Sequence, residues 1–229
     1  MTLRRDIITS AIGILVLTLM LGILYPLVIT GVSQVAFPGN ANGQKVYVGG
    51  KLVGSKIIGQ QFADVVTNPK TGKPKLDANG NPVTTPDPHY FQTRPSGTTP
   101  PDNAAGTAFA NYGPNSIVTE QALKANIASY IALDKAPNGQ PYNPGGLTAA
   151  TIPVDAADTS ASGIDPDISI ANADIQAYRI AAVRHLPMST VRGLISKYSV
   201  ARGIGFSGEP GVDVLELNLA LNRLSPSTR

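Results

Sequence analysis

One uncharged run dominates the N-terminal end of this chain. No charged residue occurs between Ile7 and Phe37, and the next charge after Asp6 is Lys45. The densest part of the run, residues 12–32, would rise about 31 Å as an α-helix, close to the roughly 30 Å hydrocarbon core of a bilayer. Only a helix satisfies all the backbone polar groups of a single segment there. We therefore expect one transmembrane helix over residues 7–36.

A cleaved signal peptide is the competing interpretation of this run. Signal peptides have an apolar core of about 7–15 residues followed by a small-x-small cleavage site. The run is about twice that length, and the nearest site, Ser33-Gln34-Val35, ends in a residue that is not small. We therefore expect the helix to be retained in the mature protein.

The charges beside the run predict its orientation. Arg4 and Arg5 directly precede it, and no basic residue follows until Lys45. By the positive-inside rule these two arginines are the topology determinants. Residues 1–6 are then cytoplasmic, and residues 37–229 form a single extracytoplasmic domain on the periplasmic side.

Composition limits what this domain can be. Its length suffices for one hydrophobic core, and 23 Gly and 19 Pro residues beside 42% hydrophobic content indicate a loop-rich globular domain. The net charge of +3 is not gathered into a basic stripe, so nucleic acid is not an expected partner. With no cysteine, disulfides, thiolate catalysis and cysteine-based zinc sites are excluded.

Hydrophobic periodicity predicts an α+β fold with mixed helices and strands after the membrane helix. Residues 44–62 read as a β-hairpin with a turn at Gly49-Gly50, and a short strand is expected to end at Val154. Helices are expected over residues 118–133, 171–186, 188–202 and 213–224. Pro/Gly/Asn-rich stretches near 65–88 and 135–150 are interpreted as inserted surface loops. Four aromatic residues in the irregular stretch that follows the first loop are expected to be held in a core or an interface: Tyr90, Phe91, Phe109 and Tyr112.

Residues 203–208 read GIGFSG and match the GxGxxG pattern. A dinucleotide site requires this pattern to follow a strand and open a helix. Here a predicted helix precedes the pattern and Glu209-Pro210 follows it. We interpret the segment as a flexible connector between helices.

Catalytic and metal-binding patterns are weak. Asp155, Asp158, Asp165 and Asp167 form the only acidic cluster, and their Pro, Ser and Gly neighbours favour turns and helix caps over Ca²⁺ ligands. His89 and His185 lie far apart in the chain, and nothing in the sequence places either beside a carboxylate or a nucleophile. We predict no catalytic, metal-binding or cofactor-binding residue. A membrane-anchored extracytoplasmic hydrolase is therefore the weakest functional alternative.

The membrane run carries small residues at helical spacing. Thr18, Gly22, Pro26 and Thr30 recur every four residues, with Tyr25 beside them. Small residues at this spacing allow another helix to approach closely, and Pro26 would kink the helix unless a neighbour compensates. We expect a partner-helix interface at these five residues. A plain anchor is the alternative.

Three stretches together resemble one family. They are LGILYPLVITGVSQVAFP, then VGSKIIGQQF followed by HYFQTRPS, and the tail SASGIDPDIS…YRIAAVR…GEPGVDVLELNLAL. In this order and over nearly the whole chain they are similar to the C subunit (KdpC) of the Kdp-type potassium-transporting P-type ATPase of bacteria. The departures are the two longer loops, the stretch AGTAFANYGPNS where the family has a Ser-Gly-Gly-Ser-Asn-rich segment, and Asp167 where His is expected.

The resemblance implies an accessory, non-catalytic subunit of a high-affinity ATP-driven potassium uptake complex in the inner membrane. Its implied partners are a channel-like potassium-binding subunit, a P-type ATPase subunit and, as a further candidate, a very small fourth subunit. The family is also described as a catalytic chaperone that raises the ATP affinity of the ATPase subunit. The topology argued above conflicts with that role, since it separates the domain from cytoplasmic ATP. ATP is therefore expected as a ligand of the complex, and no cofactor is assigned to this chain.

Overall fold

The computed structural model describes residues 3–98, 101–106, 112–113 and 115–225. Within it the chain divides into two compact units, residues 1–53 and residues 54–229. The first unit contains the apolar helix, and the second contains most of the helices and strands.

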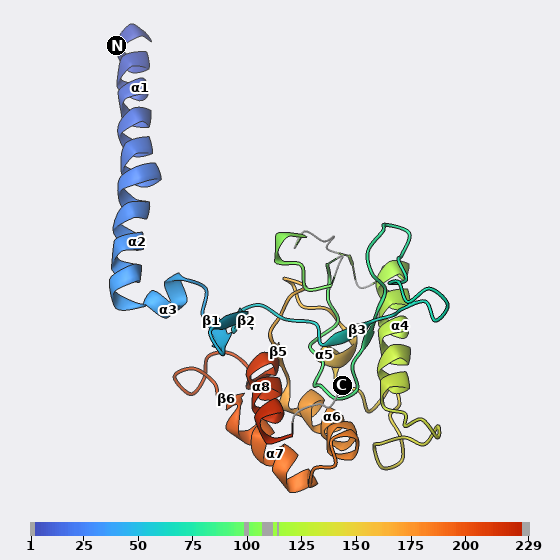
Figure 1. Cartoon of the computed structure of the whole chain (residues 1–229). Helices are drawn as coiled ribbons and strands as arrows, with labels where there is room; N and C mark the ends of the chain where they lie inside the picture. The colour runs from blue at the N-terminus through green and yellow to red at the C-terminus, as the bar shows by residue number, and fades with distance from the viewer. Residues whose placement is uncertain (1–2, 99–100, 107–111, 114, 226–229) are drawn as a thin grey trace. The chain divides into compact units, whose positions relative to one another are not determined.

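The N-terminal unit is built on one long helix. It comprises α1 (Leu3–Leu19), a five-residue π-helical turn η1 (Met20–Leu24) and α2 (Tyr25–Ala36), which continue as one rod in Figure 1. Over residues 3–36 the helix is long and apolar enough to cross a membrane, and none of its described residues is buried within the protein. The predicted helix is thus confirmed, while its membrane orientation stays a prediction.

A short α3 (Pro38–Ala41) leads from this helix to the predicted hairpin. The two strands of the hairpin are β1 (Lys45–Val48) and β2 (Lys51–Ser55). Gly49 and Gly50 have φ angles of +57° and +78°. Two positive φ angles in a two-residue turn match the twist of the flanking strands, so the turn is where the sequence placed it.

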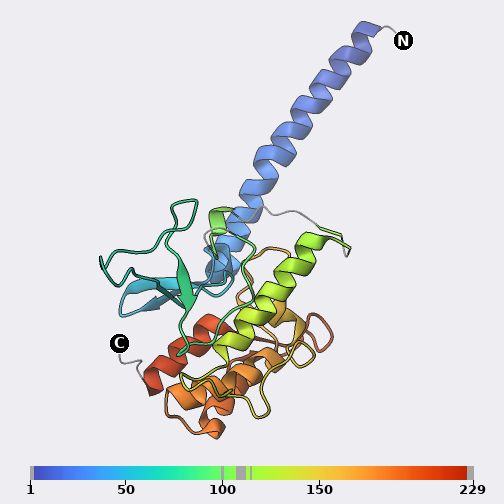
Figure 2. The same cartoon turned by 90° about the vertical axis from the view of Figure 1, so that its right-hand side faces the viewer.

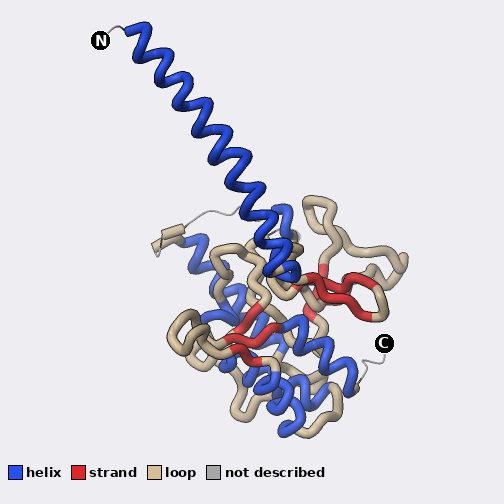
Figure 3. The backbone as a smooth tube through the Cα atoms, turned by 90° about the vertical axis from the view of Figure 1, so that its left-hand side faces the viewer, coloured by secondary structure: helices blue, strands red, loops and turns tan. Residues whose placement is uncertain are grey.

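The stretch predicted as a surface loop near residues 65–88 is mostly exposed loop, and its two ends pair to form an arm. It begins in β3 (Ala63–Val65) and ends in β4 (Thr84–Pro86), which pair antiparallel (Figure 3). Beyond them, Val66 N–H donates to Val83 O, Lys75 N–H to Val66 O and Val83 N–H to Lys75 O, each at 2.8 Å. The sequence did not predict this pairing, because an exposed arm satisfies its backbone by pairing and needs no apolar alternation.

Four predicted helices are present in the second unit, with adjusted bounds: α4 (Ile117–Leu133), α6 (Ile170–Val183), α7 (Met188–Lys197) and α8 (Val214–Leu224). A 3₁₀ turn η2 (Ala104–Gly106) precedes α4. The predicted strand ending at Val154 is wrong. Val154 instead opens the single-turn helix α5 (Val154–Ala157), which packs on α4 (Figure 2).

A small antiparallel sheet has the order β5-β7-β6, from β5 (Asp167–Ile168), β7 (Gly211–Asp213) and β6 (Ser199–Val200). β6 occupies residues that the sequence assigned to the end of a helix. Residues 201–210 therefore connect two strands of a hairpin. The interpretation of the GxGxxG segment as a connector between helices was wrong, although it still opens no helix.

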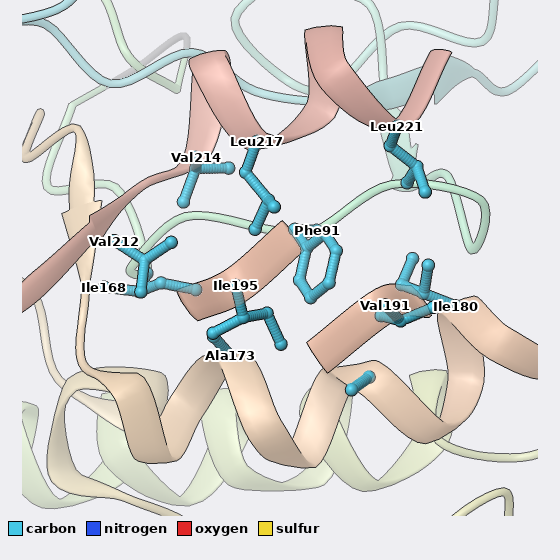
Figure 4. Close-up of a cluster of buried hydrophobic side chains, with 11 residues drawn as sticks. Phe91, Ile168, Ala173, Ile180, Val191, Ile195, Val212, Val214, Leu217 and Leu221 are labelled. Atoms are coloured by element: carbon cyan, nitrogen blue, oxygen red, sulfur yellow. The ribbon is translucent and has the colours of Figure 1, made fainter. Parts of the chain in front are cut away.

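The main hydrophobic core lies between the sheet and helices α6, α7 and α8 (Figure 4). Eleven buried side chains form it: Phe91, Ile168, Ala173, Ala177, Ile180, Val191, Ile195, Val212, Val214, Leu217 and Leu221. Phe91 is the only one of the eleven that comes from a loop rather than a helix or strand. The loop that contains Phe91 therefore passes through the core. A second cluster joins Ile152, Ala156 and Ala157 to α4.

Candidate functional site

The π-helical turn lies next to Pro26. Tyr25 N–H donates to Met20 O, five residues back, instead of to the carbonyl four residues back. Proline has no N–H and its ring crowds the carbonyl four residues earlier, here that of Gly22. The wider turn accommodates the ring, so the expected kink is resolved inside the chain, and the helix continues through Pro26 as α2 (Figure 1).

This turn changes which residues share a side of the helix. In a regular α-helix each residue advances about 100°, so Thr18 and Thr30 would differ by about 120°. A π-bulge adds one residue without adding rotation, which reduces the difference to about 20°. A Cβ built on Gly22 lies 3.9 Å from Thr18 Cγ2, so these two residues are direct neighbours. Thr18, Gly22, Pro26 and Thr30 thus form one stripe, the helix face, with Tyr25 at its edge.

In the second unit, the segment 88–92 is held almost entirely by side chains. Each of its five carbonyl oxygens accepts a hydrogen bond from a side chain of α6, of α8 or of Arg184, the residue that ends α6. Among the described residues the segment pairs with no strand, so these donors replace the ladder that buried extended backbone normally requires. We call the arrangement the clasp.

Two carboxamides form the centre of the clasp. Asn218 accepts from Phe91 N–H and donates to Phe91 O, both at 2.9 Å. Gln176 repeats the pairing on Gln92, accepting from its N–H at 2.7 Å and donating to its O at 3.0 Å. Each amide thus satisfies one donor and one acceptor of the main chain, as a neighbouring strand would.

Two arginines complete the clasp. Arg179 donates to the carbonyls of Pro88 and Tyr90 and to Gln176 Oε1, and it is 2% exposed. Burial lowers the pKa of Arg179 to about 10, which leaves it charged at neutral pH. Arg184 donates to His89 O and Ser225 O and lies 4.8 Å from the ring centroid of Tyr90. Both guanidinium groups therefore donate hydrogen bonds to main-chain carbonyls of residues 88–92.

The structure places one histidine beside a carboxylate, which the sequence could not do. His89 Nδ1 lies 2.8 Å from Asp87 Oδ1, and Asp87 is 4% exposed. The same carboxylate accepts from His89 N–H, so the pair also shapes the turn that enters the clasp. A carboxylate at Nδ1 also orients the imidazole of hydrolase triads, in which the other ring nitrogen activates a hydroxyl group.

A cleft of about 260 Å³ opens between the segment after the clasp and α4. Arg94, Ser96, Asp102 and Tyr130 are among its lining residues. Arg94 is already engaged, since it donates to the carbonyls of Asp158 and Thr159 and lies 3.6 Å from Asp165 Oδ2. Burial raises the pKa of Asp102 to about 6. The cleft is thus lined by one carboxyl group and by a guanidinium that is already paired within the protein.

The four aspartates of the acidic cluster do not share one ligand site, and two of them make separate local contacts. Asp155 accepts from Ser169 N–H and Oγ and from Asn172 Nδ2, and so fixes the start of α6. Asp165 accepts from Asp167 N–H in a turn. Within the described residues no group of three His, Cys, Asp or Glu side chains could hold a metal ion. The prediction that these carboxylates serve caps and turns is confirmed at Asp155 and Asp165.

The predicted aromatic residues separate into two groups. Phe91 is fully buried, and Tyr90 is half-buried and stacks on Phe62 with ring centroids 5.2 Å apart. Tyr112 is 57% exposed, so it lies outside the core, and its place in an interface stays a prediction. Phe109 lies outside the described residues. No pattern in the sequence pointed to the clasp residues Gln176, Arg179, Arg184 and Asn218, because buried polar side chains carry no periodic signal.

Comparisons with known proteins identify the family of this chain. Residues 7–223 match the family described as KdpC, the K⁺-transporting ATPase c chain. The chain belongs to the KdpC family. The potassium-transporting ATPase KdpC subunit of Herminiimonas arsenicoxydans is 39% identical over 97% of each chain. The KdpC subunit of Koribacter versatilis is 36% identical over 98% of this chain and 97% of its own length. The KdpC subunit of Mycobacterium tuberculosis is 36% identical over 97% of this chain and 100% of its own length.

As a KdpC-family chain, this protein is a subunit of the K⁺-transporting ATPase complex. The stretches that indicated the family in the sequence meet in the structure. HYFQTRPS contains residues 89–92 of the clasped segment, YRIAAVR supplies Arg179 and Arg184, and VLELNLAL supplies Asn218. These KdpC-like stretches are therefore joined by main-chain recognition within the domain.

Proposed function

We propose that this chain is an accessory, non-catalytic subunit of a high-affinity, ATP-driven K⁺ uptake complex. It is needed for assembly and activity of the channel-like and P-type ATPase subunits. Membership in the KdpC family supports the complex. The cations of the clasp and of the cleft are engaged with main-chain carbonyls, which supports a role in binding rather than in chemistry.

The proposal includes a topology. Arg4 and Arg5 hold the N-terminal end of the helix in the cytoplasm, and the second unit functions on the outer side of the inner membrane. The charge asymmetry of the sequence supports this orientation. Protease added to intact spheroplasts should remove the second unit, whereas protection from the protease would contradict the topology.

The main structural support for the accessory role is the helix face. The π-helical turn at Met20–Leu24 keeps Thr18, Gly22, Pro26 and Thr30 on one side of a helix that has no buried residue of its own. A plain anchor gains nothing from such a stripe, whereas a partner helix can approach closely along small residues. We therefore place the contact with the membrane helices of the partner subunits on this face.

Gly22→Leu tests this contact. The substitution fills the helix face while retaining an apolar, helix-compatible side chain, so membrane insertion should persist and the yield of intact complex should fall. Gly13→Leu is the matched control. Gly13 lies nine residues earlier, about 180° around the helix, and nothing lies within 4 Å of a Cβ built on it. If tagged Gly22→Leu chain recovers its partners as well as Gly13→Leu does, the helix is a simple tether.

The alternative function is direct contact with ATP to raise the affinity of the ATPase subunit. In the second unit, the cleft beside Arg94 and Tyr130 is one candidate for such a contact. Engagement of Arg94 by two carbonyls and Asp165 counts against phosphate binding there. Photoreactive ATP that labels this chain, and is displaced by unlabelled ATP, would favour this alternative over the accessory role.

A further inference from the structure

The loop between β6 and β7 exposes two large apolar side chains at its tip. Ile204 is 89% exposed and Phe206 is 77% exposed, and they are the most exposed large hydrophobic residues among those described in the second unit. The loop projects beside the β6 label in Figure 1. We call these two residues the fingertip. A soluble surface has little use for paired apolar side chains that protrude so far.

Hydrogen bonds hold the fingertip in a fixed shape. Gly203 N–H donates to Ser207 O at 2.7 Å, and Ser207 N–H donates to Gly203 O at 2.8 Å. Phe206 N–H closes the turn onto Gly203 O at 3.2 Å. At its base, Arg202 donates to Gly208 O at 2.9 Å and to Glu209 Oε2 at 2.5 Å. The apolar side chains therefore project from a small, internally bonded loop.

Ile204 adopts a backbone conformation that is unfavourable for its type. Its φ is +54°, and the following Gly205 has φ +81°. Two successive positive φ angles in such a turn favour Asn-Gly, whereas a β-branched residue there is a true outlier. An apolar side chain is thus retained at the tip against the preference of the backbone.

We propose that the fingertip docks into an apolar pocket on another protein subunit of the complex. A fluid lipid surface offers no reward for a fixed, strained turn, whereas a shaped pocket does, because a preorganised side chain loses less freedom on binding. Buried Ile and Phe side chains act as anchors in such pockets. The inference rests on the proposed accessory function, since it needs the assembled complex.

Ile204→Asn separates docking from folding. The substitution creates Asn-Gly at a turn that prefers it, so the melting temperature of the full chain in detergent should stay equal or rise. The recovery of partner subunits through a tag on this chain should nevertheless fall at least about tenfold at limiting concentration. If the variant is more stable but recovers fewer partner subunits, a folding defect cannot explain the loss. Undiminished recovery would overturn the proposal.

Thiol accessibility provides a second measurement. The chain has no cysteine, so Phe206→Cys introduces a unique thiol, and a maleimide-polyethylene glycol adduct shifts this chain alone on a gel. Labelling of the Phe206→Cys variant should slow at least about tenfold in the purified complex relative to the isolated chain. The matched control is Asn79→Cys, in an exposed turn of the arm between β3 and β4, where the labelling rate should stay the same.

The arms of the experiment distinguish three outcomes. Protection of the thiol at position 206 only when the other subunits are present supports the proposal. Protection in vesicles that hold this chain alone overturns it in favour of lipid contact, and unchanged labelling in the intact complex overturns it while leaving the accessory function standing. The proposed function itself fails if the unmodified chain recovers no partner subunits. That result is read from the unmodified chain, before any fingertip variant is compared.

Discussion

Asn218 on α8 pairs with both main-chain polar groups of Phe91, 127 residues earlier in the chain, at 2.9 Å in each direction. Both residues are fully buried. The pairing lets a loop residue place its ring in the centre of the core while its backbone remains satisfied. Without the amide, a buried N–H and a buried C=O would each lose their partner, which is costlier than losing an exposed hydrogen bond.

Asn218→Leu should therefore be strongly destabilising, although the two side chains are similar in size. Two buried groups left unsatisfied correspond to about 2–6 kcal/mol, which chemical denaturation of the purified chain in detergent would measure. Asn79→Leu, in an exposed turn, serves as the control and should change stability by less than about 0.5 kcal/mol. Equal stability of the two variants would show that the backbone of Phe91 is satisfied in another way.

Gly163→Ala should also destabilise the second unit. A Cβ at this position would lie 2.9 Å from both Cα and N of Gly97, and Gly163 has φ +71°. Gly139→Ala has the same type of backbone angle, φ +81°, with nothing within 4 Å of the added Cβ. The control should lose about 1 kcal/mol from backbone strain alone. The difference in melting temperature between the variants then isolates the contact with Gly97.

The cap of α8 should make stability depend on pH. Burial is the main cause that raises the pKa of Asp213 to about 6, although its carboxylate accepts from Glu216 N–H at 2.7 Å. A raised carboxyl pKa means that the folded state binds the proton more tightly than the unfolded state, so this contribution to stability is full below about pH 4 and is lost as pH rises through about 6.

Asp213→Asn keeps a capping oxygen and removes the titration. It should match the unmodified chain near pH 4 and melt at a higher temperature at pH 8, as differential scanning calorimetry at the two pH values would show. Asp213→Ala lacks the cap and should melt lower than Asp213→Asn at both. A constant difference between Asp213→Asn and the unmodified chain at all pH values would contradict the predicted titration.

Pro26→Ala should weaken assembly although it improves the helix. With an N–H restored at residue 26, the turn at Met20–Leu24 can return to α-helical bonding, and Thr18 and Thr30 would separate by about 120°. Circular dichroism should show equal or higher helicity. Co-purification of partners should fall about fivefold or more, the equivalent of about 1 kcal/mol of helix packing. Full recovery would show that the π-helical turn does not set the face.

Periodic features of the fold could be predicted from the sequence. Apolar spacing and turn residues predicted the long apolar helix, the Gly49-Gly50 turn and helices α4, α6, α7 and α8. Features without a period could not. The arm of residues 63–86 has few apolar residues, and β6 is only two residues long, so neither shows apolar alternation.

The candidate sites divide in the same way. Spacing alone indicated Thr18, Gly22, Pro26 and Thr30, but the spacing assumed a regular α-helix, and the π-helical turn is what brings Thr30 back into line with Thr18. Their role as an interface stays a prediction. The fingertip was visible as residues 203–208, yet only the fold shows Ile204 and Phe206 to be exposed. The clasp depends on long-range pairs such as Gln92 with Gln176, which local patterns do not encode.

The order in which the clasp closes has a consequence during synthesis. Residues 88–92 emerge from the ribosome long before Gln176 and Asn218, their partners 84 and 127 residues later. Contacts of such long sequence separation are slow to form because a large loop must close first. A nascent chain already inserted through its first helix would therefore wait at the membrane with an open core until α8 has been made. Loss of the last helix should leave inserted but incompletely folded protein that proteases degrade.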